Sequence, residues 1–243
     1  MQNIIIVGTS HIAKESVQNV KKTIKDRKPD IVAVELDIKR YYGLLQKQKP
    51  KISIYNLPRV GFKGFLFAFL GSWASKKLGK MVGVEPGDEM KAAIKLAKKN
   101  KIKLALIDRD IEVTLSRFSK ALTWKEKWQF IKDIFNGIFF KNKQIKKYGL
   151  NEFDLSKVPS TVLIEKLMKM MKEKYPSIYM VLVEERNKYM AKKLQEILMK
   201  NPDATIVAVV GAGHVKGMHD ILSAPSFTFS FDYVGQEDQT TVL

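Results

Sequence analysis

The feature that most constrains the fold is an alternation between short apolar runs and helical stretches. Residues 4–7 and 31–34 are β-branched apolar runs. Between them, from Ala13 to Arg27, apolar side chains recur at helical spacing until Lys28-Pro29-Asp30 ends the pattern. A strand, a helix and a second strand in this order form a β-α-β unit with parallel strands and a right-handed crossover. We therefore expect an α/β fold.

The same alternation continues to the last third of the chain. The remaining predicted helices cover residues 37–48, 85–100 and 215–223, and the remaining predicted strands cover 103–107, 205–210 and 226–233. The last of these strands, SFTFSFDY, alternates polar and aromatic residues as a half-exposed edge strand does. Residues 111–200 are helical in pattern and predict a large helical insertion. We expect one domain over residues 1–243, with a mixed, mostly parallel central sheet and flanking helices.

The composition excludes every site that needs cysteine, and the positive net charge has two possible explanations. The chain of 243 residues contains no cysteine, which excludes disulfides, thiolate metal sites and a cysteine nucleophile and fits a cytoplasmic protein. The N-terminus has no basic region before its apolar run, so we expect no signal peptide. The net charge of +18 indicates either a lysine-rich solvated surface or an anionic partner. No nucleic-acid-binding motif accompanies this charge, so we expect no nucleic-acid partner.

A phenylalanine-rich segment at residues 61–83 is the main candidate for contact with a membrane. Its longest uncharged run, from Gly64 to Ser75, is too short to span a bilayer. The segment is expected to be a helix buried against other helices, with an interfacial membrane helix or a partner surface as the alternatives.

Polar residues follow each of the predicted parallel strands. His11 comes after the first, Glu35 after the second, Asp108 and Arg109 after the third, and His214 after the fourth. Ligands of open α/β sheets bind beyond the carboxyl ends of the strands, so these side chains are expected to crowd one edge. Both histidines stand in a Gly-x-x-His setting, with Gly8 and Gly211, where glycine permits a tight turn. His219, on the helix that follows, is expected to be structural.

Two imidazoles and a carboxylate suit more than one chemistry. With open positions for water they form a divalent-metal site, whose ion lowers the pKa of bound water and so supplies a nucleophile. A second carboxylate takes the proton, and an arginine stabilises the oxyanion. Alternatively, a histidine oriented by Glu35 or Asp108 activates water without a metal. The residues alone do not choose between these.

The chain resembles the pheromone-shutdown family called TraB. The resemblance is carried by GTSH at 8–11, VAVEL at 32–36, EERNKYMAKKL at 184–194 and VGAGH at 210–214, and it is closest to archaeal members. The wider superfamily includes the Tiki metalloproteases and erythromycin esterase. The resemblance implies a hydrolase, specifically a peptidase, that uses manganese or cobalt, with zinc as the alternative. It also implies that such domains commonly continue into membrane-spanning segments, so this chain is expected to be a soluble domain of a membrane protein or a short member of the family.

The resemblance assigns roles residue by residue. His11, His214 and Glu35 match the metal and catalytic positions, and Gly8 and Gly211 match the paired motifs. Arg186 and Asn187 match an Arg-Asn pair of the family. The residue pattern without the resemblance predicts that Glu184, Glu185 and Arg186 lie on a solvated helix face. From the resemblance, Arg186 is instead expected to act in catalysis by binding a carboxylate or carbonyl oxygen of the substrate. Asp108, Arg109 and Glu89 are expected to line the substrate site.

Three hypotheses follow for the function. The first is a metal-dependent hydrolase acting on a peptide or small signalling substrate. The second is a module that binds a peptide or another small ligand without turning it over. The third is a membrane-associated scaffold that uses residues 61–79 or its basic face. The chain is also expected to form a homodimer.

Overall fold

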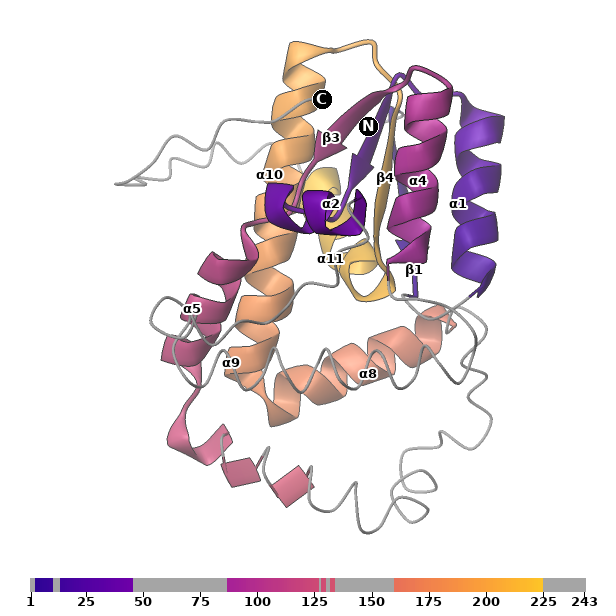
Figure 1. Cartoon of the computed structure of the whole chain (residues 1–243). Coiled ribbons are helices and arrows are strands. Elements are labelled where there is room, and N and C mark those ends of the chain that lie inside the picture. The colour runs from indigo at the N-terminus through magenta and orange to yellow at the C-terminus, as the bar shows by residue number, and fades with distance from the viewer. Residues whose placement is uncertain are drawn as a thin grey trace.

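A parallel four-stranded sheet forms the centre of the computed structural model (Figure 1). The structure describes residues 3–10, 14–45, 87–126, 128–129, 132–133 and 160–224. The strands are β1 (Ile4–Thr9), β2 (Ile31–Val34), β3 (Lys103–Leu106) and β4 (Ile206–Gly211). Their order across the sheet is β1-β4-β2-β3, and each pairing is parallel. The prediction of an α/β fold with parallel strands is confirmed.

Helices cover both faces of the sheet, as parallel strands require (Figure 1). The helices α1 (Lys14–Arg27) and α4 (Asp88–Lys99) pack on one face, and α10 (Glu185–Lys200) and α11 (Ala212–Ser223) pack on the other. Alternate residues of β2 divide between the two cores: Val32 and Val34 contact the first, and Ile31 and Ala33 contact the second. All four are buried, which explains why this strand is an uninterrupted apolar run in the sequence.

The remaining helices lie beside or beyond the carboxyl ends of the strands. The helix α2 (Ile38–Leu45) follows β2, and α5 (Ile111–Ala121) follows β3. Within the predicted helical insertion, α8 (Thr161–Lys174) crosses the region beyond the sheet and leads through α9 (Pro176–Tyr179) into α10 (Figure 1). A π-helical segment, η2 (Met180–Glu184), joins α9 to α10. Pro176 occupies the first turn of α9, a position where its missing N–H costs no helical hydrogen bond.

Two expectations differ from the structure, and others fall outside it. The last described helix begins at Ala212 rather than at residue 215, so His214 lies in its first turn and not in a loop. Gly211 has φ −59° and Gly8 does not have a positive φ, so neither glycine makes the tight turn that was expected. The Phe-rich segment and the edge strand over 226–233 lie outside the described residues. Across the part that is described, no helix combines the length and apolar character needed to cross a bilayer.

Candidate functional site

Three strand ends and one helix start bring a buried polar cluster together at the carboxyl edge of the sheet. Glu35 follows β2, Asp108 follows β3, and His214 follows β4 in the first turn of α11. Arg186 lies in the first turn of α10, which also points toward this edge. Glu35, Asp108 and His214 are buried, and 15% of the Arg186 side chain is exposed. We call these four residues the central cluster.

Arg186 is the residue that joins the other three. Its Nη2 donates to Oε1 of Glu35 and, at 2.6 Å, to Oδ2 of Asp108, while Nε donates to Oδ1 of Asp108 at 3.1 Å. Its Nη1 donates to the carbonyl oxygen of Leu182 at 3.4 Å and lies 3.1 Å from Nε2 of His214. A guanidinium has five N–H groups, and these contacts use all of them. Arg186 therefore points into the cluster, as the resemblance implied, rather than into solvent.

The contacts of His214 fix its tautomer. Nδ1 lies 2.6 Å from Oδ1 of Asn187, and Nε2 faces Nη1 of Arg186. An amide oxygen can only accept a hydrogen bond, and a guanidinium can only donate one. Both contacts are satisfied by a neutral imidazole with its proton on Nδ1. The lone pair of Nε2 then points into the cluster, where Oε1 of Glu35 lies 3.4 Å away.

Glu35 is held in its ionised form by its surroundings. Burial alone raises the pKa of the Glu35 carboxyl, but the positive charge of Arg186 and the hydrogen bond from the Gly211 N–H hold this pKa below its ordinary value. That N–H donates to Oε2 at 2.6 Å. The second glycine of the paired motifs thus supplies a backbone donor to the site instead of a turn.

Asp108 is a second buried carboxylate with several cationic partners. Arg40 of α2 donates from Nη2 to Oδ2 of Asp108 at 2.5 Å, the oxygen that Arg186 also contacts. Burial raises the pKa of Asp108, but Arg186 and Arg40 outweigh it and hold this pKa well below its usual range. Asp37 in turn orients Arg40 by accepting from its Nε at 2.5 Å and from its backbone N–H at 2.9 Å.

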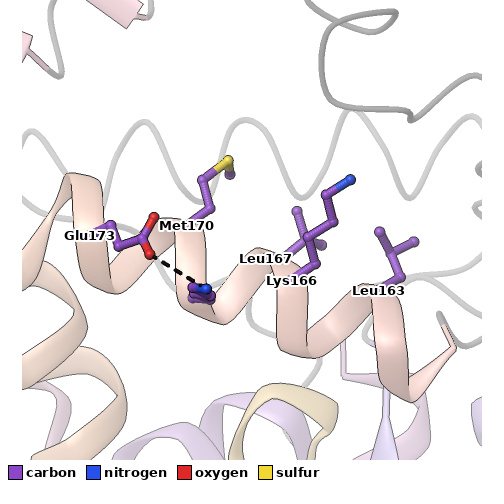
Figure 2. Close-up of a pocket in the computed structure, with 6 residues that line it drawn as sticks. Leu163, Lys166, Leu167, Met170 and Glu173 are labelled. Carbon is purple, nitrogen blue, oxygen red and sulfur yellow. Dashed lines mark ion pairs between the residues drawn. The ribbon is translucent and has the colours of Figure 1, made fainter.

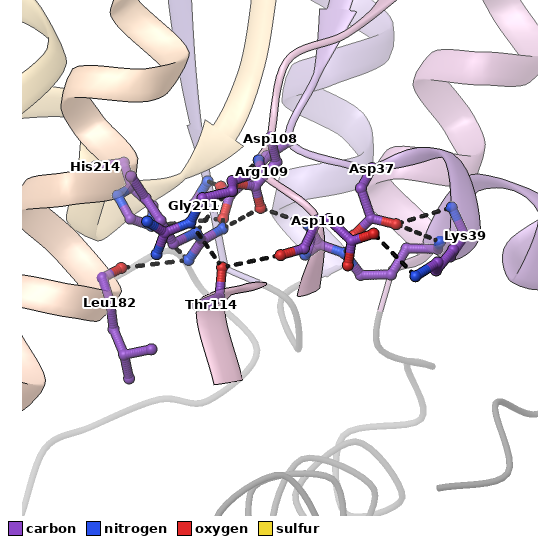
Figure 3. A network of polar contacts seen from close by, with 12 residues as sticks. Asp37, Lys39, Asp108, Arg109, Asp110, Thr114, Leu182, Gly211 and His214 are labelled. Atoms are coloured by element: carbon purple, nitrogen blue, oxygen red, sulfur yellow. Dashed lines mark hydrogen bonds and ion pairs between the residues drawn. The ribbon is translucent and has the colours of Figure 1, made fainter. Parts of the chain in front are cut away.

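Arg109 lies next to the central cluster but forms different contacts (Figure 3). Its Nη1 donates to Oε2 of Glu185 at 2.9 Å, and its Nε donates to Oγ1 of Thr114 at 3.2 Å. Arg117 contacts the same Glu185 carboxylate through Nε at 2.7 Å and Nη2 at 2.5 Å. Burial raises the pKa of Glu185, but hydrogen bonds from Arg117 and Arg109 outweigh it and lower the pKa overall.

Two glycines permit the helices to approach the site closely. A Cβ on Gly217 of α11 would lie 2.2 Å from Nδ2 of Asn187, so only glycine leaves room for the amide that orients His214. A Cβ on Gly8, at the end of β1, would lie 2.7 Å from Cγ2 of Val215 and 3.4 Å from Cα of Ala212. Close packing explains both residues. Gly217 was not predicted, although it follows His214 by three residues.

The other predicted site residues are placed as follows. Asn187 joins the cluster through His214. Glu89 is buried in the first turn of α4, whose apolar residues pack on the face of the sheet that α1 also covers. His11 lies outside the described residues, so its predicted role as a metal ligand stays a prediction. Sequence reasoning missed Arg40, whose only local signal was the Asp37 three residues before it.

The donor atoms fit a metal ion in part. Nε2 of His214 and Oε1 of Glu35 are a typical imidazole and carboxylate donor pair, and the Asn187 contact to Nδ1 is the kind of outer contact that metal-bound histidines have. Arg186 contacts both atoms, however, so an ion could bind there only if those contacts were exchanged. Among the residues described, no group of three or more His, Cys, Asp and Glu side chains is arranged to hold a metal.

A hollow on α8 is lined by residues that do not belong to the central cluster. It has a volume of about 230 Å³ and is lined by Leu163, Leu167 and Met170 together with charged residues (Figure 2). Lys169 and Glu173 form a 4.0 Å ion pair beside it. The apolar side chains that line this hollow offer no group for acid-base chemistry.

Comparison with known proteins identifies the family. The profile of the TraB/PrgY/gumN family matches residues 1–226. An uncharacterized protein of Methanocaldococcus jannaschii is 39% identical over 218 residues, which are 89% of this chain and 52% of that protein. The TraB domain-containing proteins of mouse and human are 30% and 29% identical over 239 residues, covering 88% of this chain and 61% of each relative. The chain thus spans between half and two thirds of the length of these relatives. With the family profile matched over nearly its whole length, the chain belongs to the TraB/PrgY/gumN family.

Proposed function

We propose that the central cluster is the active site of a metal-dependent hydrolase that cleaves peptides. The observation that carries the proposal is the orientation of His214. Its Nδ1 proton is held by Asn187, and its Nε2 lone pair faces the ionised carboxylate of Glu35. In this proposal His214 and Glu35 are metal ligands, and the predicted third ligand is His11. A bound divalent ion would supply a water of lowered pKa as the nucleophile.

The charged groups around Glu35 favour a role for it as a metal ligand rather than as a general base. A general base works best when its pKa lies near the working pH, and the pKa of Glu35 is held below its ordinary value. The same argument applies to Asp108, which is held ionised by Arg186 and Arg40. Arg186 is proposed to keep the two carboxylates ionised and aligned. Binding of a substrate oxygen by Arg186 would require it to exchange one of its present contacts.

The test is metal binding measured by calorimetry. Manganese, cobalt and zinc are titrated separately into the wild-type chain, into His214→Ala, and into His219→Ala. His219 is a matched control, because it lies on the same helix but is exposed. We expect about one equivalent to bind to wild type and to His219→Ala, and binding to be lost in His214→Ala. A peptide library should then be cleaved, with chelator abolishing cleavage and metal restoring it. If none of the three metals binds to wild type, the metal-dependent mechanism is wrong.

A second candidate function is ligand binding without turnover. The observation that favours it is the charge balance of the site, because Arg186 already neutralises the carboxylates that a metal would need. In that case a peptide should bind saturably, His214→Ala should weaken its binding, and mass spectrometry should recover the peptide intact. A membrane surface as a partner remains a prediction that rests on residues 61–79, outside the described part of the chain.

A further inference from the structure

One nitrogen of Arg109 is buried without a hydrogen-bond partner. Its Nε and Nη1 are used by Thr114 and Glu185, but Nη2 is inaccessible to solvent and bonds to nothing. Within the described ranges, it is the one buried side-chain nitrogen or oxygen in this condition. Leaving a charged buried donor unpaired is unfavourable, and such an atom in a native structure calls for an explanation.

The side-chain partners of Arg109 also differ from those of Arg186. Arg109 and Arg117 both form ion pairs with the carboxylate of Glu185. Arg186, by contrast, contacts two carboxylates, those of Glu35 and Asp108. An anionic group placed at Nη2 of Arg109 would satisfy the unpaired donor.

Arg109 is joined directly to the central cluster. Its backbone N–H donates at 2.8 Å to Oδ1 of Asp108, the same oxygen that accepts from Nε of Arg186. Glu185, its side-chain partner, precedes Arg186 in the first turn of α10. Figure 3 shows Asp108, Arg109 and Thr114 in one continuous network with His214. A group held by Arg109 would therefore bind to a residue that is in direct contact with the central cluster.

We propose that Arg109 is the substrate-anchoring residue of this site and that its Nη2 binds a carboxylate of a peptide. The proposal rests on the hydrolase or peptide-binding function above, and it names the substrate class: peptides that carry a carboxylate near the group held at the central cluster. A planar guanidinium with a spare N–H edge is well suited to a carboxylate. The carboxylate is supplied by the peptide C-terminus or by an acidic side chain.

The experiment separates these two sources. Three pools of N-acetylated pentapeptides are incubated with the full chain, and bound peptides are quantified by affinity selection and mass spectrometry. The first pool has free C-termini and no acidic residues, the second is the same pool amidated, and the third is amidated and contains one Asp or Glu. The proteins are wild type, Arg109→Gln, Arg109→Lys and Arg117→Gln. Arg117 is the matched control, because it contacts the same Glu185 but is 54% exposed.

We expect wild type to retain the first or the third pool about ten-fold better than the second. Arg109→Gln should abolish this preference, Arg109→Lys should retain part of it, and Arg117→Gln should stay within about two-fold of wild type. Thermal melting confirms that each variant is folded, and the lysine variant tests the proposal if the glutamine variant is not. The absence of any preference for carboxylate-bearing pools in wild type would overturn the proposal. So would a preference in folded Arg109→Gln, or an undiminished preference in Arg109→Lys.

The same experiment distinguishes failure of the anchor from failure of the proposed function. Carboxylate-dependent retention of intact peptides, without cleavage at any metal concentration, supports Arg109 and rejects the hydrolase. Cleavage that is indifferent to carboxylates and to Arg109 rejects the anchor and leaves the hydrolase standing.

Discussion

Arg186 and Arg109 both donate a hydrogen bond to Asp108, but their other side-chain contacts differ. Arg186 uses all its donors and is paired with two buried carboxylates, so its charge is fully compensated inside the protein. Arg109 shares one carboxylate with Arg117 and has a buried nitrogen without a partner. The difference indicates that Arg186 organises the site, because all its donors are used inside the protein. Arg109 retains a donor that a ligand could use.

The largest expected effect tests the organising role of Arg186. Arg186→Met should lower the free energy of unfolding by about 3–5 kcal/mol, because it leaves two buried carboxylates without their shared cation. Arg109→Met should lower it by only about 1 kcal/mol, because Glu185 keeps Arg117. Urea denaturation of both variants gives the two values. Equal losses would remove the distinction between these arginines.

The next effect tests the packing that orients His214. Gly217→Ala should lower the free energy of unfolding by about 1–3 kcal/mol, because a methyl group cannot fit 2.2 Å from the Asn187 amide. In ¹⁵N NMR spectra of the imidazole, His214 should lose its preference for the Nδ1–H tautomer. Gly43→Ala is the control, since a Cβ there has no atom within 4 Å. An unchanged His214 spectrum in Gly217→Ala would contradict the proposed role of Asn187.

The pH dependence of stability sharpens the comparison further. The pKa of Asp108 is lower in the folded protein than in the unfolded chain, so the unfolded chain binds more protons in acid. This contribution to stability is present above a pH of about 4, the ordinary pKa of aspartate, and is lost as the pH falls below it toward the folded value. Asp108→Asn should flatten that acid limb in thermal melts recorded from neutral to acidic pH. An acid limb of unchanged slope would show that other carboxyl groups cause it.

The smallest expected effect concerns Arg117. Its contact with Glu185 is exposed, and such pairs contribute about 0–1 kcal/mol. Arg117→Gln should therefore change the free energy of unfolding by less than about 0.5 kcal/mol in moderate salt, as measured by urea denaturation. A much larger loss would mean that Arg109 alone does not compensate the charge of Glu185.

The sequence was sufficient to predict the four described strands and the edge of the sheet where the central cluster lies. Buried parallel strands are short apolar runs, and their carboxyl ends must meet at one edge, so Glu35, Asp108 and His214 could be placed together from pattern alone. The predicted reason for the glycines was wrong. Gly8 is needed for close contact with α11. Gly211 contributes a backbone N–H, which any residue except proline could supply. A close contact of this kind cannot be distinguished from a turn in the local sequence.

The sequence by itself determined the parallel α/β architecture and the residue types available at the carboxyl edge. Tertiary structure decided which of them pair. The residue pattern predicted that Glu184, Glu185 and Arg186 lie on a solvated helix face. In the structure Glu184 ends the π-helical segment η2 and Glu185 begins α10. Arg186 turns inward to Glu35 and Asp108, residues 151 and 78 positions away along the chain. Pairings over such separations depend on the distances between packed elements, which no local pattern of residues encodes.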